Sequence, residues 1–282
     1  ARPRELTQHP SVAAHDCIGS NIYIHTRGNR VIRVVPRENE SINESWISDR
    51  DRFSYTALSD ETRIESPMMR VKGKLQPVDW ETAINSAAKK LSAAANKNAS
   101  QIAALISPQA TLEEHFLAQK LLRGLGSNNI DHRLNQVDFS SQKKAAVMPW
   151  LGRSLESVES LKACLIVGGN LRLEQPILSH RLRKAVVNNG AKVSLLCHIG
   201  GRSNYPVFEE LIGSAEQLLD DLGSVVVALA EKSRTELSTH LGKLLDGVRP
   251  RKEHLSIARS LRAGKKSAVI VSIQALSSHT CR

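Results

Sequence analysis

The side chains best suited to metal chemistry stand near the N-terminus. His15, Cys17 and His25 offer two imidazoles and a thiol within one short segment. A structural zinc site needs four protein ligands that close around the ion. Because His15 and Cys17 occupy alternating positions of a short stretch, their side chains need not converge with that of His25. The pattern therefore does not favour a metal site.

A second chemical signal is a pair of glycines in the middle of the chain. Gly168 and Gly169 follow the apolar run ACLIV and precede a helical pattern that starts near Pro176. Ligands of open α/β sheets bind at the carboxyl ends of strands, where glycine lets the backbone approach a phosphate and a helix N-terminus attracts it. No GxGxxG fingerprint accompanies the pair, so a tight strand-to-helix turn is the simpler interpretation.

The residues by themselves do not indicate an enzyme. Neither a nucleophile elbow nor a Ser/His/Asp set is visible, and the four cysteines have no zinc or thioredoxin-like spacing. Cys164 and Cys197 lie inside apolar, strand-like runs and are predicted to be buried thiols, because free cysteine packs as a small hydrophobe. This cysteine usage is typical of a reducing compartment.

The elements that position these residues fall into two regions. Residues 1–67 are predicted to form a small β-rich domain, in which the runs NIYIHT and RVIRVVP are joined by Arg27-Gly28-Asn29. This junction is typical of a β-hairpin, because Gly and Asn adopt positive φ readily. From residue 68 to residue 282 helical and strand-like patterns alternate, which predicts an α/β region whose sheet is cut short.

The α/β region carries clear boundary signals. Asp79 is a predicted helix N-cap, and the pairs Thr111 with Glu114 and Ser214 with Gln217 are predicted capping boxes. A further helix, EQPILSHRLRKAVVNNG, has a proline near its first turn and a glycine just past its end. The predicted strands are QIAALIS, KACLIVGGN, AKVSLLCH and SAVIVSI. Strand–helix–strand units of these lengths predict a parallel sheet with helices on its faces.

The composition and charge of the chain limit the kinds of partner that it could bind. The 282 residues are 41% hydrophobic and 24% charged, as in ordinary globular proteins, and no apolar run is long enough to span a bilayer. A net charge of +11 fits nucleic acid, anionic lipid or an acidic protein. The runs RLRK from Arg181 and RPRK from Arg249 are predicted to be solvated faces or helix ends. With 4% aromatic residues, stacking platforms are scarce, which disfavours nucleic acid.

The aromatic residues that exist cluster near the end of the small domain. Trp46, Phe53 and Tyr55 lie close together in the sequence and are predicted to pack that domain. If Trp46 is buried, its replacement by alanine costs about 3–5 kcal/mol. The chain begins at Ala1, so we expect either a processed protein or a piece of a longer one.

Two blocks of sequence resemble the G subunits of respiratory NADH:quinone oxidoreductase, complex I. These subunits contain a domain descended from molybdopterin oxidoreductases such as formate dehydrogenase. The similarity runs from about Val12 to Leu196, and in the α/β region it rests on IVGGNLRLEQPILSHRLRKA. The first block contains Gly19-Ser20-Asn21-Ile22, Trp46-Ile47-Ser48-Asp49 and Pro67-Met68-Met69-Arg70. The resemblance implies an α/β fold of the formate dehydrogenase/DMSO reductase type behind a small β-rich domain.

The resemblance also implies four positions for an iron–sulfur cluster. In cluster-bearing relatives those positions are cysteines, and here they are Ala13, Asp16, Ser20 and Ser48. A [4Fe–4S] cluster is held by four thiolates, and Cys17 is one residue out of register, which in extended chain points to the other face. We therefore expect a degenerate 4Fe–4S domain without metal and no cofactor in this chain, with the iron–sulfur clusters in an N-terminal part that is absent here.

The position of a molybdenum ligand follows from the same resemblance. Formate dehydrogenase relatives place a cysteine or selenocysteine a few residues after a signature that reads Asn128-Asn129-Ile130-Asp131 here. That position falls near Val137, which cannot ligate, although Asp138 beside it offers a carboxylate. The resemblance makes Gly168-Gly169-Asn170 the relic of a dinucleotide site, and we expect no catalytic residue.

These expectations combine into one function and two alternatives. The resemblance implies a non-catalytic structural portion of the G subunit, off the electron path from NADH to quinone, with other peripheral-arm subunits as partners. Neither nucleic acid nor direct membrane insertion is expected. The location would be the cytoplasmic face of the bacterial inner membrane, or the matrix side in mitochondria. The first alternative is a molybdopterin-binding, formate dehydrogenase-like oxidoreductase fragment, recognisable by a ligand at Val137–Asp138. The second is a basic nucleic-acid-binding protein.

Overall fold

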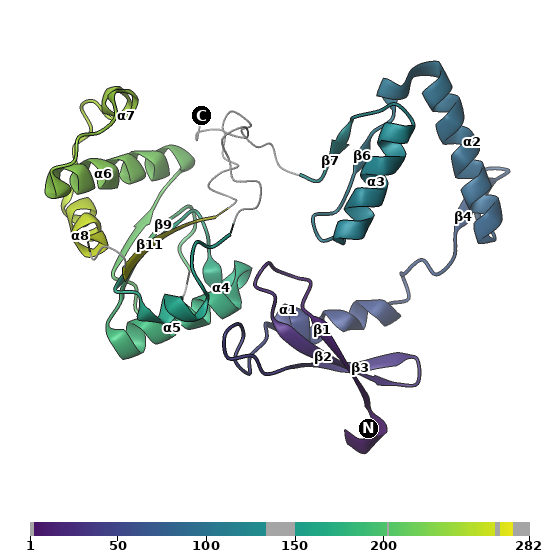
Figure 1. The fold of residues 1–282 in the computed structure, drawn as a ribbon, viewed down its shortest axis with the longest axis horizontal. Helices are drawn as coiled ribbons and strands as arrows, with labels where there is room; N and C mark the ends of the chain where they lie inside the picture. Colours follow the sequence, from purple (N-terminus) through teal and green to yellow (C-terminus); the bar gives the residue numbers. More distant parts are fainter. Residues whose placement is uncertain (1–2, 134–149, 202, 263–265, 273–282) are drawn as a thin grey trace. The chain divides into compact units, whose positions relative to one another are not determined.

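The computed structural model describes residues 3–133, 150–201, 203–262 and 266–272 (Figure 1). The chain forms two compact units. Unit 1 combines Ala1–Phe53 with Gln136–Arg282, and unit 2 is Ser54–Asn135. The division into domains at residue 67 stays a prediction.

Unit 1 begins with a three-stranded antiparallel sheet in the order β1-β2-β3. Gly28, with φ of 59°, turns the chain between the last two strands, so the predicted hairpin is confirmed. The first strand was not predicted, because its sequence TQHPSV is polar and contains a proline. A short helix follows the sheet. The bounds are β1 Thr7–Val12, β2 Asn21–Arg27, β3 Arg30–Pro36 and α1 Asp49–Phe53.

The α/β part of unit 1 is a four-stranded, fully parallel sheet in the order β10-β9-β8-β11. The predicted fold class is thus confirmed. Its central strand β8 carries only buried residues, as its continuous apolar sequence predicts. The elements are β8 Ala163–Val167, α4 Leu171–Glu174, α5 Pro176–Asn189, β9 Lys192–Cys197, β10 Glu209–Ile212, α6 Ala215–Ser233, α7 Thr239–Leu244, α8 Lys252–Leu261 and β11 Ser267–Val271.

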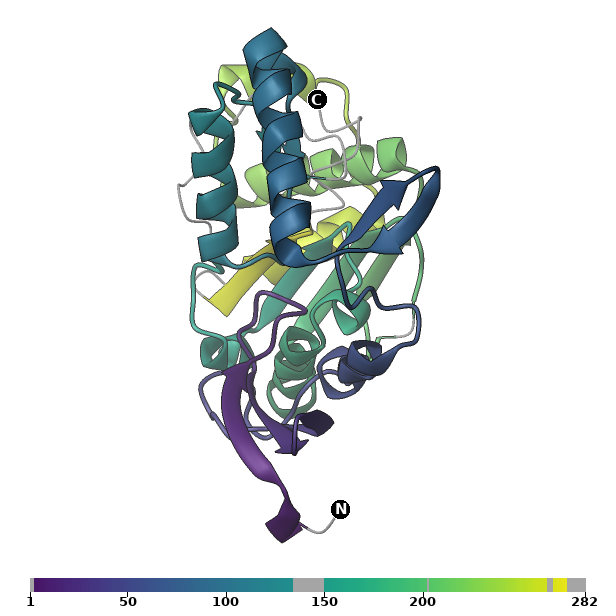
Figure 2. The ribbon, with the colours of Figure 1, turned by 90° about the vertical axis from the view of Figure 1, so that its right-hand side faces the viewer.

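Both faces of this sheet are covered (Figure 2). Ile166 packs with Leu182 of α5 on one face, while Leu165 packs with residues of α6 and α8 on the other. Alternation along the central strand produces the two cores, because successive side chains of a strand point to opposite faces. Cys164 and Cys197 are buried as predicted, and burial raises the pKa of the Cys164 thiol to about 12.

The described residues of unit 2 contain a β-hairpin, two α-helices and a pair of short parallel strands. Asp79 accepts a hydrogen bond from the Thr82 amide, and Thr111 forms a capping box with Glu114, so both predicted helix starts are confirmed. The strand predicted from QIAALIS is only two residues long. The elements are β4 Met68–Val71, β5 Lys74–Pro77, α2 Trp80–Asn98, β6 Ala104–Leu105, α3 Leu112–Gly124 and β7 Ile130–Asp131. None of the described helices in either unit is both long and apolar enough to cross a bilayer.

Trp46 does not pack the N-terminal region, so that prediction is wrong. Its side chain is 56% exposed, and Phe53 is 57% exposed. The segment is held instead by Asn43, which is 1% exposed. The Asn43 side chain accepts from the Asn21 N–H at 2.9 Å and donates to the Trp46 carbonyl at 3.0 Å. A buried amide that bonds several backbone groups fixes this loop without an aromatic core.

Candidate functional site

The order of the parallel strands marks one place where a ligand of such a fold would bind. From β8 the chain continues to β9 and β10 on one side, and only later adds β11 on the other side of β8. Ligands of open α/β sheets bind at this switch point, at the carboxyl ends of the diverging strands. Here the two strand ends lead into Gly168-Gly169-Asn170 and into Ser272. The structure therefore places the predicted glycine loop at the expected position.

The chain's own side chains fill this switch point. The Asn170 backbone amide donates to a carboxylate oxygen of Glu174 at 2.8 Å, and the Ser272 hydroxyl donates to the other oxygen at 3.4 Å. A Cβ added to Gly169 would lie 2.6 Å from the Ser272 Cβ and 3.2 Å from Glu174 Oε2. An internal carboxylate thus takes the backbone amide that a bound phosphate would use.

The hollow beside this loop is small. It is lined by residues such as Asn170, Ser179 and Tyr205 and has a volume of about 20 Å³, which is space for about one water molecule. Burial raises the pKa of Tyr205 to about 12, so its phenol stays neutral at physiological pH. The residues present at the switch point do not fit a bound dinucleotide phosphate.

The four positions assigned to a cluster come together in unit 1. The Ala13 amide donates to the Ser20 carbonyl at 2.8 Å, which joins the first and third positions. The Ser48 hydroxyl donates to Asp51 at 2.7 Å, and the other oxygen of Asp51 lies 2.8 Å from His15 Nδ1. Asp51 thereby connects Ser48, the fourth position, with His15, which precedes the second position, Asp16.

Buried oxygens at these positions lack hydrogen-bond partners. Asp16 Oδ2 and Ser20 Oγ make no hydrogen bond within the described part of the chain. Burial raises the pKa of Asp16. The hydrogen bond from the Ile18 amide and the charge of the Arg50 guanidinium, 3.5 Å away, act in the opposite direction but do not outweigh burial. Cys17 is exposed and receives a 3.6 Å contact from Gln175. Within the described residues no three His, Cys, Asp or Glu side chains are grouped so as to hold a metal ion.

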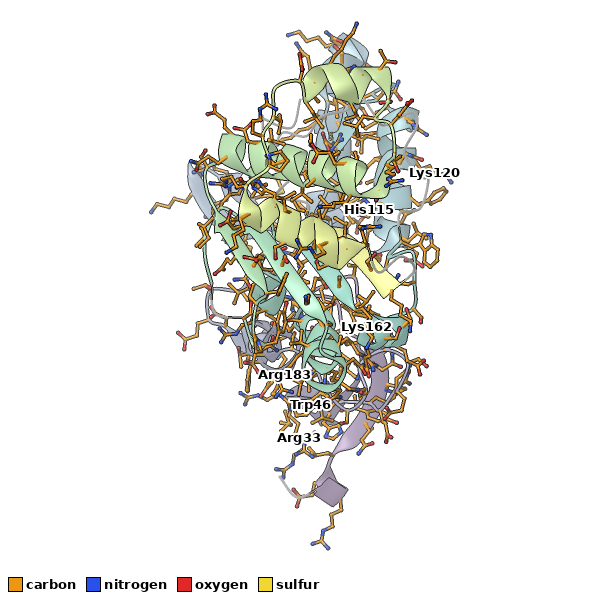
Figure 3. The ribbon with its side chains drawn as sticks, turned by 90° about the vertical axis from the view of Figure 1, so that its left-hand side faces the viewer. Arg33, Trp46, His115, Lys120, Lys162 and Arg183 are labelled. Carbon is orange, nitrogen blue, oxygen red and sulfur yellow. The ribbon has the colours of Figure 1, made fainter. Side chains whose placement is uncertain are left out.

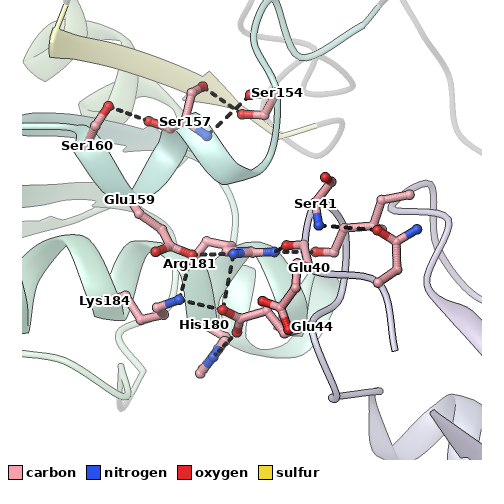
Figure 4. A network of polar contacts seen from close by, with 12 residues as sticks. Glu40, Ser41, Glu44, Ser154, Ser157, Glu159, Ser160, His180, Arg181 and Lys184 are labelled. Atoms are coloured by element: carbon pink, nitrogen blue, oxygen red, sulfur yellow. Dashed lines mark hydrogen bonds and ion pairs between the residues drawn. The ribbon is translucent and has the colours of Figure 1, made fainter. Parts of the chain in front are cut away.

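A network of charged side chains ties the N-terminal segment to α5 (Figure 4). Arg181 is 2% exposed, binds Glu44 and Glu159, and also donates to the carbonyls of Glu40 and Ile42. Lys184 binds the same two carboxylates, and His180 lies 3.1 Å from Glu44. Burial opposes the ionisation of both carboxylates. The hydrogen bonds and charges of Lys184 and Arg181 outweigh burial and lower both pKa values.

The burial of Arg181 contradicts the prediction that RLRK is a solvated face or helix end. Residues two apart on a helix point to different sides, so Arg181 and Arg183 cannot both face solvent when one side of the helix is packed. The Arg-x-Arg spacing in the sequence therefore indicates that the two arginines have different environments. The acidic partners could not be found from it, because Glu44 and Glu159 are distant in the chain and meet Arg181 only after folding.

The comparisons with known proteins agree with this architecture. A family model described as "Molybdopterin oxidoreductase" matches residues 63–220, which is more than half of the chain. The chain belongs to this family. A second model, "NADH-ubiquinone oxidoreductase NDSU1/NuoG-like, 4Fe-4S domain", matches residues 6–56. Among solved structures of this fold, acetylene hydratase from Pelobacter acetylenicus superposes with a TM-score of 0.62 over 94% of this chain and 40% of that one, at 12% identity.

Curated relatives narrow the position within the molybdopterin oxidoreductase family. The NADH-quinone oxidoreductase G subunit of Rickettsia felis is 34% identical over 222 residues, 79% of this chain and 32% of that protein. The "NADH-ubiquinone oxidoreductase 75 kDa subunit" of Reclinomonas americana is 33% identical over 68% of this chain and 29% of that protein. The chain is thus a homologue of the complex I G subunit, and it spans about a third of the length of these relatives.

The 4Fe–4S match corrects the cofactor prediction. The expectation of no cofactor in this chain, with the iron–sulfur clusters in an N-terminal part that is absent here, is wrong, because a 4Fe–4S domain model matches residues 6–56 of this chain. The expectation rested on the four cluster positions, none of which is a cysteine in this sequence. A [4Fe–4S] cluster needs four thiolates, and within residues 6–56 this chain has one cysteine, Cys17, so the residues present do not supply that donor set.

The molybdenum-ligand prediction lies mostly outside the described residues. Val137 and Asp138 belong to that undescribed segment. Within the preceding signature, Ile130–Asp131 forms β7 and pairs with β6. The Asp131 carboxylate binds Arg133 at 2.8 Å, and this interaction lowers the Asp131 pKa. These contacts stabilise the end of a strand. The assignment of the ligand position to Val137–Asp138 stays a prediction.

Proposed function

We propose that this chain is a non-catalytic, structural part of the G subunit of NADH-quinone oxidoreductase. In that role it belongs to the peripheral arm of complex I, with the other subunits of the arm as partners. It lies at the cytoplasmic face of the bacterial inner membrane, or on the matrix side if the protein is mitochondrial. The homology to the G subunit supports this assembly. The observation that carries the non-catalytic role is the Glu174 carboxylate bonded to the Asn170 amide at the switch point.

Three features of unit 1 support a structural role. Glu174 and Ser272 close the crevice where related folds bind ligands. The Glu174 carbonyl accepts a 2.8 Å hydrogen bond from Arg50, so the same residue holds α1. The Arg181 network then fastens the N-terminal loops to α5. These interactions stabilise the unit and hold the polar groups that take part in them in fixed pairs.

The test is binding and turnover by the purified chain. Isothermal titration with a guanine or nicotinamide dinucleotide should give no binding to the wild type, and NADH and formate should not be oxidised. Glu174→Gln is the informative variant, because it removes the charge that competes with phosphate but keeps the side-chain shape. Micromolar dinucleotide binding by the wild type, abolished by Gly169→Val, would show that the switch point is open and refute the proposal.

A molybdopterin-binding oxidoreductase fragment is the second candidate. The match of the molybdopterin oxidoreductase family over residues 63–220 favours it. The discriminating variant is Asp138→Ala. After reconstitution with cofactor, formate-dependent dye reduction by the wild type that is lost in Asp138→Ala would support this candidate over the structural role.

A further inference from the structure

Trp46 is the centre of an exposed patch on unit 1. Its ring lies 5.6 Å from the ring of His180, and it remains 56% exposed. Arg183 and Val187 follow His180 at helical spacings of three and seven residues, so they lie on the same side of α5. Val187 is 58% exposed. We call these four residues, Trp46, His180, Arg183 and Val187, the Trp46 patch, and Figure 3 labels Trp46 and Arg183.

The Trp46 patch is fixed before any partner arrives. The Trp46 carbonyl is held by Asn43 at 3.0 Å, and Asn43 is buried. His180 lies between the Trp46 ring and the Glu44 carboxylate, 3.1 Å from the latter. Ordering a surface in advance removes part of the entropic cost of association. Tryptophan and arginine are also the residue types enriched in binding hot spots.

The charge of the Trp46 patch selects its partner. Helix α5 has no acidic residue, and the carboxylates that reach it, Glu44 and Glu159, are bonded to Arg181 and Lys184. Arg183 is exposed and has no ion-pair partner within the described residues. Since the chain has a net charge of +11, a second copy would bring like charges together at this patch. An acidic surface would complement it.

We propose that the Trp46 patch is a docking surface for an acidic face of a partner protein. The partner packs apolar side chains on Trp46 and Val187 and places a carboxylate on Arg183. This inference rests on the proposed function, because the partner is then another subunit of the same assembly. Docking buries the exposed Trp46 ring as an aromatic anchor and gives Arg183 a charge-assisted, bidentate hydrogen bond, the geometry that Arg forms with carboxylates.

The experiment uses the complete subunit in its native membranes. A photo-crosslinking amino acid replaces Trp46, and in a matched control it replaces Trp150, which is 75% exposed. The adduct at position 46 should contain an Asp- or Glu-bearing peptide of another subunit. Arg183→Glu should reduce recovery of the subunit with the NADH-oxidising assembly about tenfold, whereas Lys243→Glu on α7 should not. Changing the crosslinked acid to lysine should restore recovery of Arg183→Glu.

The outcomes separate the two proposals. If the wild-type subunit is absent from the NADH-oxidising assembly, the proposed function and this inference both fail. If the subunit is present but position 46 yields no adduct, or only an adduct with a second copy, the docking surface alone is refuted. The same holds if Arg183→Glu lowers recovery no more than Lys243→Glu does.

Discussion

Arg181 provides the sharpest test of how unit 1 is held together. The change is Arg181→Met, which removes the charge but keeps an unbranched side chain in the buried position. Arg181 is 2% exposed and contacts Glu44, Glu159 and the carbonyls of Glu40 and Ile42. Its loss leaves the two carboxylates with Lys184 and His180 as their remaining partners among the described residues, and leaves two carbonyls without this donor.

The expected cost is large. Removing one partner of a buried ion pair destabilises proteins by about 3–5 kcal/mol. Arg181 is the buried partner here, and the Glu44 and Glu159 side chains that remain are 15% and 25% exposed. For a domain of this size class, about 1 kcal/mol corresponds to about 2–4 °C, so the melting temperature should fall by about 6–20 °C. The matched control is Arg183→Met on the same helix, where the side chain is exposed, and its effect should stay within about 0.5 kcal/mol.

The pH dependence gives an independent readout. The pKa values of Glu44 and Glu159 are lowered from 4.5, so their stabilisation is complete above that pH and is lost as the pH falls through the folded-state values. Urea denaturation of the wild type should therefore show stability that decreases below pH 4.5. In Arg181→Met this acid dependence should be weaker. Equal stability of Arg181→Met and Arg183→Met at neutral pH would refute the reasoning.

Three further predictions follow from single residues. Trp46→Ala should cost only about 1 kcal/mol or less in urea denaturation, because more than half of the side chain is exposed, and a loss above about 3 kcal/mol would show that the ring is buried. Asp16→Asn should increase stability at neutral pH: burial raises the folded-state pKa above 3.8, so the wild type loses stability as the pH rises through that window, and the gain should disappear in acid. Gly190→Ala should destabilise by about 1 kcal/mol, since φ is 64° at this helix end, and an unchanged melting temperature would contradict this.

Local signals predicted the elements well. The hairpin at Gly28, the capping boxes at Thr111 and Ser214, and the end of α5 at Gly190 are all present as expected. Each depends on residues a few positions apart, so no distant part of the chain is needed to specify it. The strands missed by prediction, such as Thr7–Val12, lack an apolar pattern and exist because a neighbouring strand pairs with their backbone.

The sequence by itself determined the parallel α/β architecture, the strands β8, β9 and β11 with the helices that follow the first two, and the glycine loop after β8. Only the tertiary structure decided what surrounds these features. It placed Glu174 on the Asn170 amide, buried Arg181 against Glu44, and left Trp46 at the surface. The physical reason is range: hydrophobic periodicity and capping act within one element, whereas charge pairing and burial depend on residues far apart in the sequence that meet only in the folded chain.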